Sequence, residues 1–188
     1  MNKADIKKEI PLIYPVAPSG EEERVAGILG AVESHIGFIP DGLRLFSFSP
    51  PLLETFAGNI SYFNGGTELS PLLMTMIRYL SSWQSQCHYC IDLNEGFLIN
   101  MGLDLDDIRA ARSNPEAAPV DKKEIPLLML ALKSVNTPDE VSDQDIKEVR
   151  ANGWSDRNMF DVVVQAANNR AFSLVLRAFN VEHQGAFA

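Results

Sequence analysis

Residues 69–98 read LSPLLMTMIRYLSSWQSQCHYCIDLNEGFL, and this stretch decides the fold class. Ser70 offers an N-cap oxygen and Pro71 suits the first turn of a helix. Apolar residues then recur at helical spacing, stop in the polar segment 81–86, and resume. They are Leu72, Leu73, Met76, Ile77 and Leu80 before the break, and Ile91, Leu93, Phe97 and Leu98 after it. The pattern predicts two consecutive helices, the second beginning at the Cys87–Cys90 tetrapeptide.

The rest of the chain carries the same kind of signal. Apolar residues recur at helical spacing from Val25 to Val32, and Gly37 followed by Pro40 ends that helix. A long helix is expected from Ser155 to about Phe179. Further helix-start signals stand at Ser49, Asp104 and Ser142. Because no run alternates β-branched and polar residues, the sequence predicts an all-α fold of about eight helices.

The length of 188 residues suits one globular domain, or one domain built from two similar halves. Pro11, Pro15 and Pro18 favour an extended N-terminal segment over residues 1–20. We expect the helical domain to cover residues 21–181 and residues 182–188 to form a tail.

The charge balance excludes two classes of partner. The chain has 16 Lys and Arg against 25 Asp and Glu, a formal net charge of −9, which is unfavourable for binding nucleic acid or an anionic membrane. No segment approaches the roughly 18 uninterrupted apolar residues of a membrane span. The charged N-terminus also lacks the apolar core of a secretory leader. We expect a soluble, cytoplasmic protein.

Both cysteines of the chain lie in one tetrapeptide, Cys87-His88-Tyr89-Cys90. Thiols at i and i+3 meet across one helical turn, so the pair suits half of a metal site or a redox couple. A structural zinc ion needs a second ligand pair, and outside the motif only His35 and His183 remain, each alone. The redox interpretation is therefore favoured. A helix N-terminus would stabilise a thiolate, and His88 either supports that charge or points to solvent.

Several segments around the tetrapeptide match a known family. They are Ile36-Gly37-Phe38-Ile39-Pro40, Ser49-Pro50-Pro51-Leu52-Leu53, Leu69-Ser70-Pro71, Gly102-Leu103-Asp104 and Gly153-Trp154-Ser155-Asp156. Over about residues 25–181 the chain resembles the carboxymuconolactone decarboxylase family, in its alkylhydroperoxidase D-like, peroxidase-related branch.

The resemblance implies an all-helical homo-oligomer, a trimer or a hexamer, that reduces hydroperoxides in antioxidant defence. In the family's mechanism the second cysteine, here Cys90, attacks the peroxide and becomes a sulfenic acid. Cys87 then resolves it to a disulfide, which a thiol reducing partner reopens. The redox-active disulfide takes the place of a cofactor, and no metal is implied.

The sequence departs from the family pattern at the proton relay. The family has a glutamate twelve residues before the first cysteine and a histidine four residues after the second, and these positions hold Thr75 and Asn94. Neither side chain titrates near neutral pH, although both can position a water. As substitutes the sequence offers His88 and Glu95 as acid or base, and Tyr89 and Gln84 as hydrogen-bond donors.

Two other functions stay open. A cofactor-free lactone decarboxylase of the same family usually lacks the cysteine pair, so the motif counts against it. A non-catalytic helical oligomer could instead sense redox state through its thiols. Rapid alkylation of Cys90 at pH 6 to 7 would distinguish a reactive pair from a structural one.

A polar run, Asn168-Asn169-Arg170, interrupts the expected C-terminal helix. Arg170 could hold an anionic substrate or pair with a carboxylate of the protein. Structural pairing is the favoured interpretation.

Overall fold

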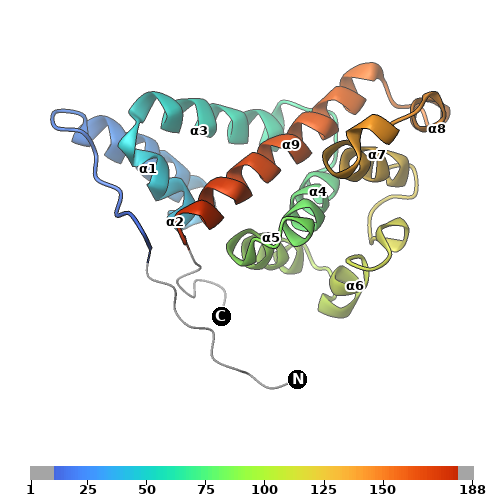
Figure 1. Ribbon diagram of the computed structural model, residues 1–188, viewed down its shortest axis with the longest axis horizontal. Helices are drawn as coiled ribbons and strands as arrows, with labels where there is room; N and C mark the ends of the chain where they lie inside the picture. The colour runs from blue at the N-terminus through green and yellow to red at the C-terminus, as the bar shows by residue number, and fades with distance from the viewer. Residues whose placement is uncertain (1–10, 182–188) are drawn as a thin grey trace. The chain divides into compact units, whose positions relative to one another are not determined.

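A computed structural model describes residues 11–181 of the chain (Figure 1). Over these residues the protein contains α-helices, short 3-10 turns and no strand, so the predicted all-α class is confirmed. The described α-helices are α1 (Glu22–Ile36), α2 (Asp41–Arg44), α3 (Pro50–Gly65), α4 (Pro71–Gln84), α5 (His88–Asn100), α6 (Leu105–Ala110), α7 (Ile125–Asn136), α8 (Asp143–Ala151) and α9 (Asp156–Ala178). These are nine described α-helices, one more than the expected number of about eight, and two of them, α2 and α6, are short.

The chain forms two compact units. Of the described residues, the first unit holds 11–66 together with 176–181, and the second holds 67–175. Residues 11–20 precede α1 and contain no helix. The predicted boundaries at residues 20 and 181 stay a prediction, and residues 1–10 and 182–188 lie outside the described residues.

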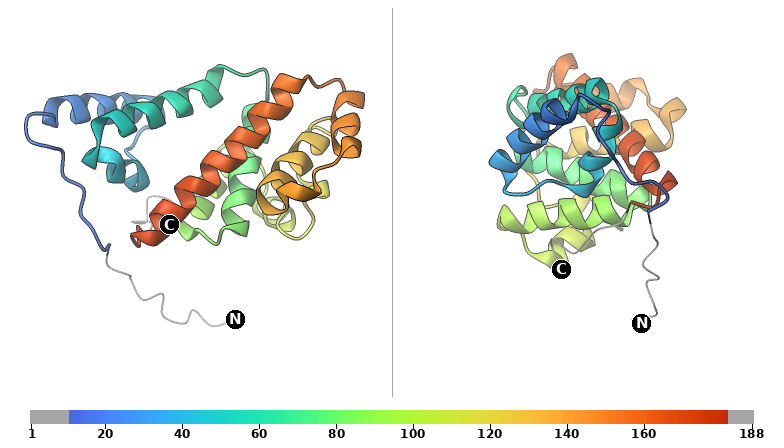
Figure 2. Two further views of the ribbon diagram at one scale, coloured as in Figure 1. Left: turned by 45° about the horizontal axis from the view of Figure 1, so that its top comes forward. Right: turned by 90° about the vertical axis from the view of Figure 1, so that its left-hand side faces the viewer.

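The first unit is built around α1 and α3, which lie side by side (Figure 2). Its buried core consists of Val25 and Leu29 from α1, Leu43 from α2 and Leu53 from α3. Phe46 and Phe56 stack against this core with their ring centroids 4.7 Å apart. Burial of these apolar side chains fixes the α1–α3 pair.

The second unit carries the cysteines. Helix α4 packs against both α5 and α7 and is buried along most of its length. The fully buried side chains of this unit include Leu73, Ile77, Leu98, Ile108, Leu127 and Leu128. A helix with this much buried surface is a rigid support for the residues that follow it.

Side-chain caps define several of the helix starts that the sequence predicts. Ser70 Oγ accepts from Leu73 N at 3.0 Å, and Asp104 Oδ1 accepts from Asp106 N at 2.8 Å. Ser142 and Asp145 form a reciprocal capping box at α8. Ser49 stands at the N-cap of α3 without using its side chain. Each cap satisfies a backbone N–H that has no partner within its helix.

Candidate active site

Cys87 and Cys90 stand at the start of α5, as the sequence predicts. Cys87 is the N-cap residue, with φ −93° and ψ 95°, and Cys90 lies in the first turn. Neither cysteine is in a disulfide, and the two Sγ atoms lie 3.0 Å apart. Each residue is only 2% exposed. The two thiols are therefore in direct contact and shielded from solvent.

A short joint between α4 and α5 sets the position of these thiols. Gln86 has a φ of 54°, in the left-handed region that non-glycine residues rarely adopt. Its backbone N–H donates to Trp83 O at 3.0 Å, and the Cys87 N–H donates to Ser82 O at 3.1 Å. These bonds close the turn within three residues and bring Cys87 directly to the N-terminus of α5.

The two thiols have different electrostatic surroundings. Cys87 lies at the positive end of the α5 dipole, beside backbone N–H groups that have no partner within the helix. The hydrogen bond with Cys87 raises the pKa of the Cys90 thiol, and burial raises it further. The hydroxyls of Ser173 and Ser82 act in the opposite direction, because they favour a thiolate at Cys90.

Ser173 and Ser82 are site residues that sequence reasoning missed. Ser173, from α9, is fully buried and influences the Cys90 thiol, and its hydroxyl makes no hydrogen bond among the described residues. Ser82 Oγ donates to Arg78 O at 2.6 Å and accepts from Asn169 Nδ2 at 3.0 Å. Asn169 Nδ2 also donates to Arg78 O at 3.1 Å, so the polar run of α9 fastens that helix to α4.

A half-buried arginine joins the two positions where the family has its proton relay. Arg78 Nε donates to Asn94 Oδ1 at 2.9 Å, and Arg78 Nη2 donates to Thr75 Oγ1 at 2.8 Å. Asn94 Nδ2 donates in turn to the backbone oxygen of Cys90 at 2.7 Å. Burial lowers the pKa of Arg78 to about 10, which leaves it charged at neutral pH. The relay positions thus hold a neutral, fixed pair of acceptors around one positive charge.

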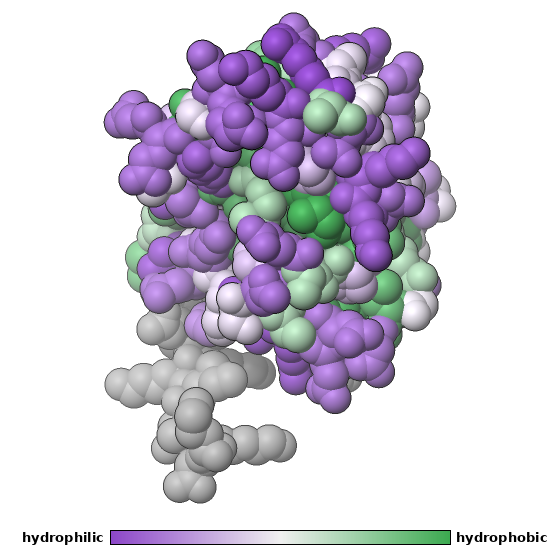
Figure 3. Space-filling view, turned by 90° about the vertical axis from the view of Figure 1, so that its right-hand side faces the viewer, coloured by the Kyte–Doolittle hydropathy of each residue, from purple (hydrophilic) through white to green (hydrophobic). Residues whose placement is uncertain are grey.

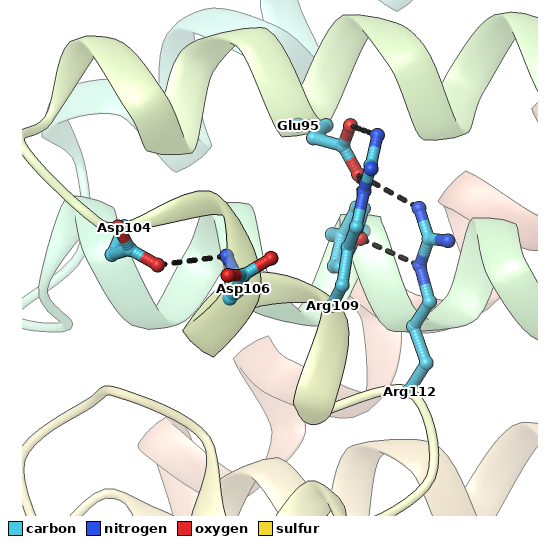
Figure 4. A network of polar contacts seen from close by, with 6 residues as sticks. Glu95, Asp104, Asp106, Arg109 and Arg112 are labelled. Atoms are coloured by element: carbon cyan, nitrogen blue, oxygen red, sulfur yellow. Dashed lines mark hydrogen bonds and ion pairs between the residues drawn. The ribbon is translucent and has the colours of Figure 1, made fainter.

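Glu95 lies in a separate network of charges, shown in Figure 4. Arg109 Nη2 donates to its Oε1, and Arg112 Nη2 donates to its Oε2, both at 2.7 Å. Tyr79 Oη donates to the same Oε2 at 2.8 Å. Burial acts to raise the pKa of Glu95, but the hydrogen bonds from Arg109 and Tyr79 and the two positive charges outweigh it, so this pKa is lowered. A carboxylate held in this way is a poor proton acceptor, and its role in a relay stays a prediction.

The remaining candidates are spread around the motif. His88 is exposed, whereas Tyr89 is buried. Gln84 accepts a hydrogen bond from Asn136 Nδ2 at 2.7 Å and lines a cavity of about 750 Å³ beside α7. Neither cysteine is among the lining residues of that cavity.

Figure 3 shows one face of the molecule, on which an apolar area is surrounded by polar surface.

Arg170 bonds within the protein, as the favoured interpretation expects, but its described partners are a backbone oxygen and an amide oxygen rather than a carboxylate. Its Nη1 donates to Val135 O at 2.7 Å and to Asn136 Oδ1 at 2.9 Å. In the described part of the chain, no three His, Cys, Asp or Glu side chains gather in a way that could hold a metal ion. Nor does any described helix have the length and apolar character needed to cross a membrane.

The structure has the fold of alkylhydroperoxidase D-like, peroxidase-related proteins. A peroxidase-related protein from Silicibacter sp. TM1040 matches with a TM-score of 0.83 and 19% identity, over 100% of this chain and 97% of that one. An alkylhydroperoxidase D core protein from Ralstonia eutropha JMP134 matches with a TM-score of 0.77 and 20% identity, over 93% of each chain. A debrominase solved with 2,3,4-tribromopyrrole matches with a TM-score of 0.72 and 16% identity, over 95% of this chain and 94% of that one. No family model and no curated protein matches the sequence.

Proposed function

We propose that the chain is a thiol-dependent hydroperoxide reductase that cycles between a dithiol and a Cys87–Cys90 disulfide. The observation that carries the proposal is the 3.0 Å contact between two buried thiols at the start of α5. A disulfide bond is ~2.05 Å long, so a small side-chain movement suffices to form one. The fold shared with peroxidase-related proteins supports the same chemistry.

In the proposed reaction the Cys90 thiolate attacks one peroxide oxygen. An S–O bond forms, the O–O bond breaks, and the leaving alkoxide takes up a proton to become an alcohol. Cys87, as a thiolate, then attacks the Cys90 sulfur, and the hydroxide released takes up a proton to become water. The net change is one hydroperoxide and two thiols to one alcohol, one water and one disulfide. An external dithiol returns the pair to the reduced state.

The raised pKa of Cys90 and the neutral relay positions give this reaction a characteristic pH dependence. Thr75 and Asn94 cannot remove a proton from Cys90, so its thiolate must form by loss of a proton to solvent or to hydroxide. The rate of peroxide reduction should therefore increase from pH 7 into the alkaline range. The Ser173 hydroxyl, which donates to no described residue, can supply a hydrogen bond to the thiolate once it has formed.

Three measurements test the proposal. The reduced protein is mixed with cumene hydroperoxide, and remaining peroxide and free thiols are counted. Wild type should lose both thiols for each peroxide consumed, and Cys87→Ser should accumulate a sulfenic acid on Cys90 that dimedone traps. Peroxide consumption that is undiminished in Cys90→Ser would overturn the assignment of Cys90, and unchanged consumption without both thiols would overturn the function.

The setting of this activity is part of the proposal. We infer a cytoplasmic homo-oligomer, trimer or hexamer, served by a thiol reducing partner. Phe160 and Leu174, on α9, are 68% and 54% exposed, and burial of these apolar side chains against another copy would stabilise an oligomer. Light scattering of the purified chain measures the oligomeric state, and a monomer would contradict this part of the proposal.

Reductive dehalogenation is a second candidate, because a debrominase shares the fold over nearly the whole chain. A dithiol can supply the two electrons that replace a carbon–bromine bond by carbon–hydrogen, releasing bromide and leaving a disulfide. Incubation of the reduced protein with 2,3,4-tribromopyrrole tests it. Stoichiometric bromide release would favour this function, and its absence alongside peroxide turnover would exclude it.

A further inference from the structure

Arg78 is the only charged residue of α4, and no carboxylate of the described residues pairs with it. Among the described residues its side chain bonds to Asn94 and Thr75, both of which are neutral. It takes part in none of the ion pairs of the described chain, so no carboxylate oxygen lies within 4.0 Å of its charged nitrogens. The Arg78 guanidinium is partly buried and has no counter-charge among the described residues, so its remaining donors can bind a further group that reaches it from solvent.

The guanidinium is held in one orientation. Thr75 Oγ1 donates to Pro71 O at 2.8 Å, and Asn94 Nδ2 donates to Cys90 O at 2.7 Å, so each acceptor is itself fixed. Nε and Nη2 are used by these two acceptors, while no described residue accepts from Nη1. Donors therefore remain beside the helical turn that carries Cys90.

The positive charge of Arg78 neither pairs with Glu95 nor is a main influence on the Cys90 thiol. Glu95, the residue after Asn94, is engaged by Arg109 and Arg112 instead. The strongest influences on the pKa of Cys90 come from Cys87, burial, Ser173 and Ser82 rather than from Arg78. Asn94 connects this positive charge to the backbone of Cys90, and the charge is thus available to a molecule that enters the site.

We infer that Arg78 binds a carboxylate of the substrate, so that the preferred hydroperoxides are organic ones that carry a carboxylate group. A carboxylate matches the planar fork of a guanidinium and can use two N–H donors at once. With a net charge of −9 the chain as a whole repels anions, so recognition of one requires a fixed local charge such as this. The inference rests on the proposed peroxidase function, because it names that function's substrate class.

The test compares cumene hydroperoxide bearing a para-carboxylate with its methyl ester. Wild type should show a kcat/KM about tenfold higher for the acid than for the ester. Arg78→Gln should lose this preference, whatever happens to the absolute rates, and Arg78→Lys should keep part of it. Arg150→Gln is the matched control, because Arg150 is exposed and pairs only with Asp156. An equal preference in wild type and Arg78→Gln would overturn the inference.

Asn94→Asp provides a test that leaves Arg78 in place. The new carboxylate has the shape of the amide that accepts from Arg78 Nε, so it would neutralise the guanidinium from within the protein. The preference for the acid should fall as in Arg78→Gln. Should Arg78→Gln fail to fold, this variant decides the question, and an undiminished preference in Asn94→Asp would contradict the inference.

A binding measurement separates this inference from the proposed function. The probe is the alcohol that corresponds to the carboxylated hydroperoxide, which cannot react with the thiols. Calorimetry should show that it binds wild type more tightly than Arg78→Gln, while the methyl ester of the alcohol binds both equally. If no hydroperoxide is turned over but the probe binds through Arg78, the peroxidase proposal fails and the carboxylate site stands. If hydroperoxide is turned over but the probe binds wild type and Arg78→Gln equally, the peroxidase proposal stands and the carboxylate site fails.

Discussion

The phenolic hydroxyl of Tyr79 donates to Glu95 Oε2 at 2.8 Å, joining α4 to α5 behind the cysteine motif. Arg112 Nε donates to the same phenolic oxygen at 2.7 Å, and its guanidinium lies 4.3 Å from the centroid of the Trp83 ring. These contacts therefore join the side chains of Glu95, Tyr79, Arg112 and Trp83 in one cluster. It holds together the two helices whose junction places the thiols.

Replacing Glu95 should weaken this junction. Glu95→Gln removes two ion pairs and leaves Arg112, whose side chain is 19% exposed, without its counter-charge. We expect a loss of roughly 2–4 kcal/mol in the free energy of unfolding, below the full cost of breaking a buried pair because Arg109 is half exposed. Urea denaturation followed by circular dichroism measures it. Glu68→Gln, at an exposed position, is the control, and equal midpoints for the two variants would contradict the prediction.

The same carboxylate should make stability depend on acid pH. Its folded-state pKa is lowered, so the stability it contributes is complete above the unfolded value of about 4.3. That contribution is lost as the pH falls through the folded-state pKa, because the unfolded chain then binds the proton more readily. Thermal unfolding between pH 7 and pH 3 should show a steeper decline for wild type than for Glu95→Gln. Parallel curves would mean that Glu95 does not carry this effect.

Two serines that precede prolines should respond differently to removal of their hydroxyls. Ser70→Ala deletes the bond to Leu73 N and should cost about 1 kcal/mol of stability. Ser49→Ala should change stability by no more than a few tenths of a kcal/mol, because the Ser49 side chain caps nothing. Chemical denaturation of both variants checks the pair. Equal losses would show that the prolines, not the cap, define these helix starts.

Ser173 should tune the Cys90 thiol without supporting the fold. In a Cys87→Ser background, Ser173→Ala should raise the pKa of Cys90 by about one unit, since it removes a hydroxyl that favours the thiolate. Iodoacetamide alkylation measured across pH 7 to 10 reports this shift. Stability should stay within about 0.5 kcal/mol of the parent, because the hydroxyl has no other partner.

Ser81→Ala is the matched control for that experiment. Ser81 is also buried on the described chain, and its hydroxyl likewise makes no hydrogen bond there. It is absent from the groups that act on Cys90. An alkylation profile that shifts equally in both variants would show that loss of a buried hydroxyl in general, and not the Ser173 contact, changes the thiol.

The placement of the thiols was predictable because it depends on local signals. The apolar period stops before Cys87 and resumes after Cys90, and a helix start is the simplest reason for such a break. Ser70, Asp104 and Ser142 likewise announce helix starts within three residues of the N–H groups that they cap. The all-α class follows from the same short-range patterns.

The residues that surround the thiols were harder to predict from the sequence. Ser173 acts on Cys90 from a position more than eighty residues further along the chain, and no local pattern distinguishes it from other serines. The Arg78 bridge did leave a signal. A lone charge within the apolar face of α4, at i+3 from Thr75, is unusual and could have marked the relay positions as occupied.

The left-handed conformation of Gln86 has a consequence for how this chain could be altered. A non-glycine residue held there costs of the order of 1–2 kcal/mol, which a glycine would recover. Yet the glycine would also let the joint sample more conformations, and the Cys87–Cys90 contact is set by that joint. A glycine at this exposed position would therefore increase the stability of the fold but loosen the alignment of the two sulfurs. Substitution of Gln86 can thus change the chemistry of the thiols without changing either cysteine.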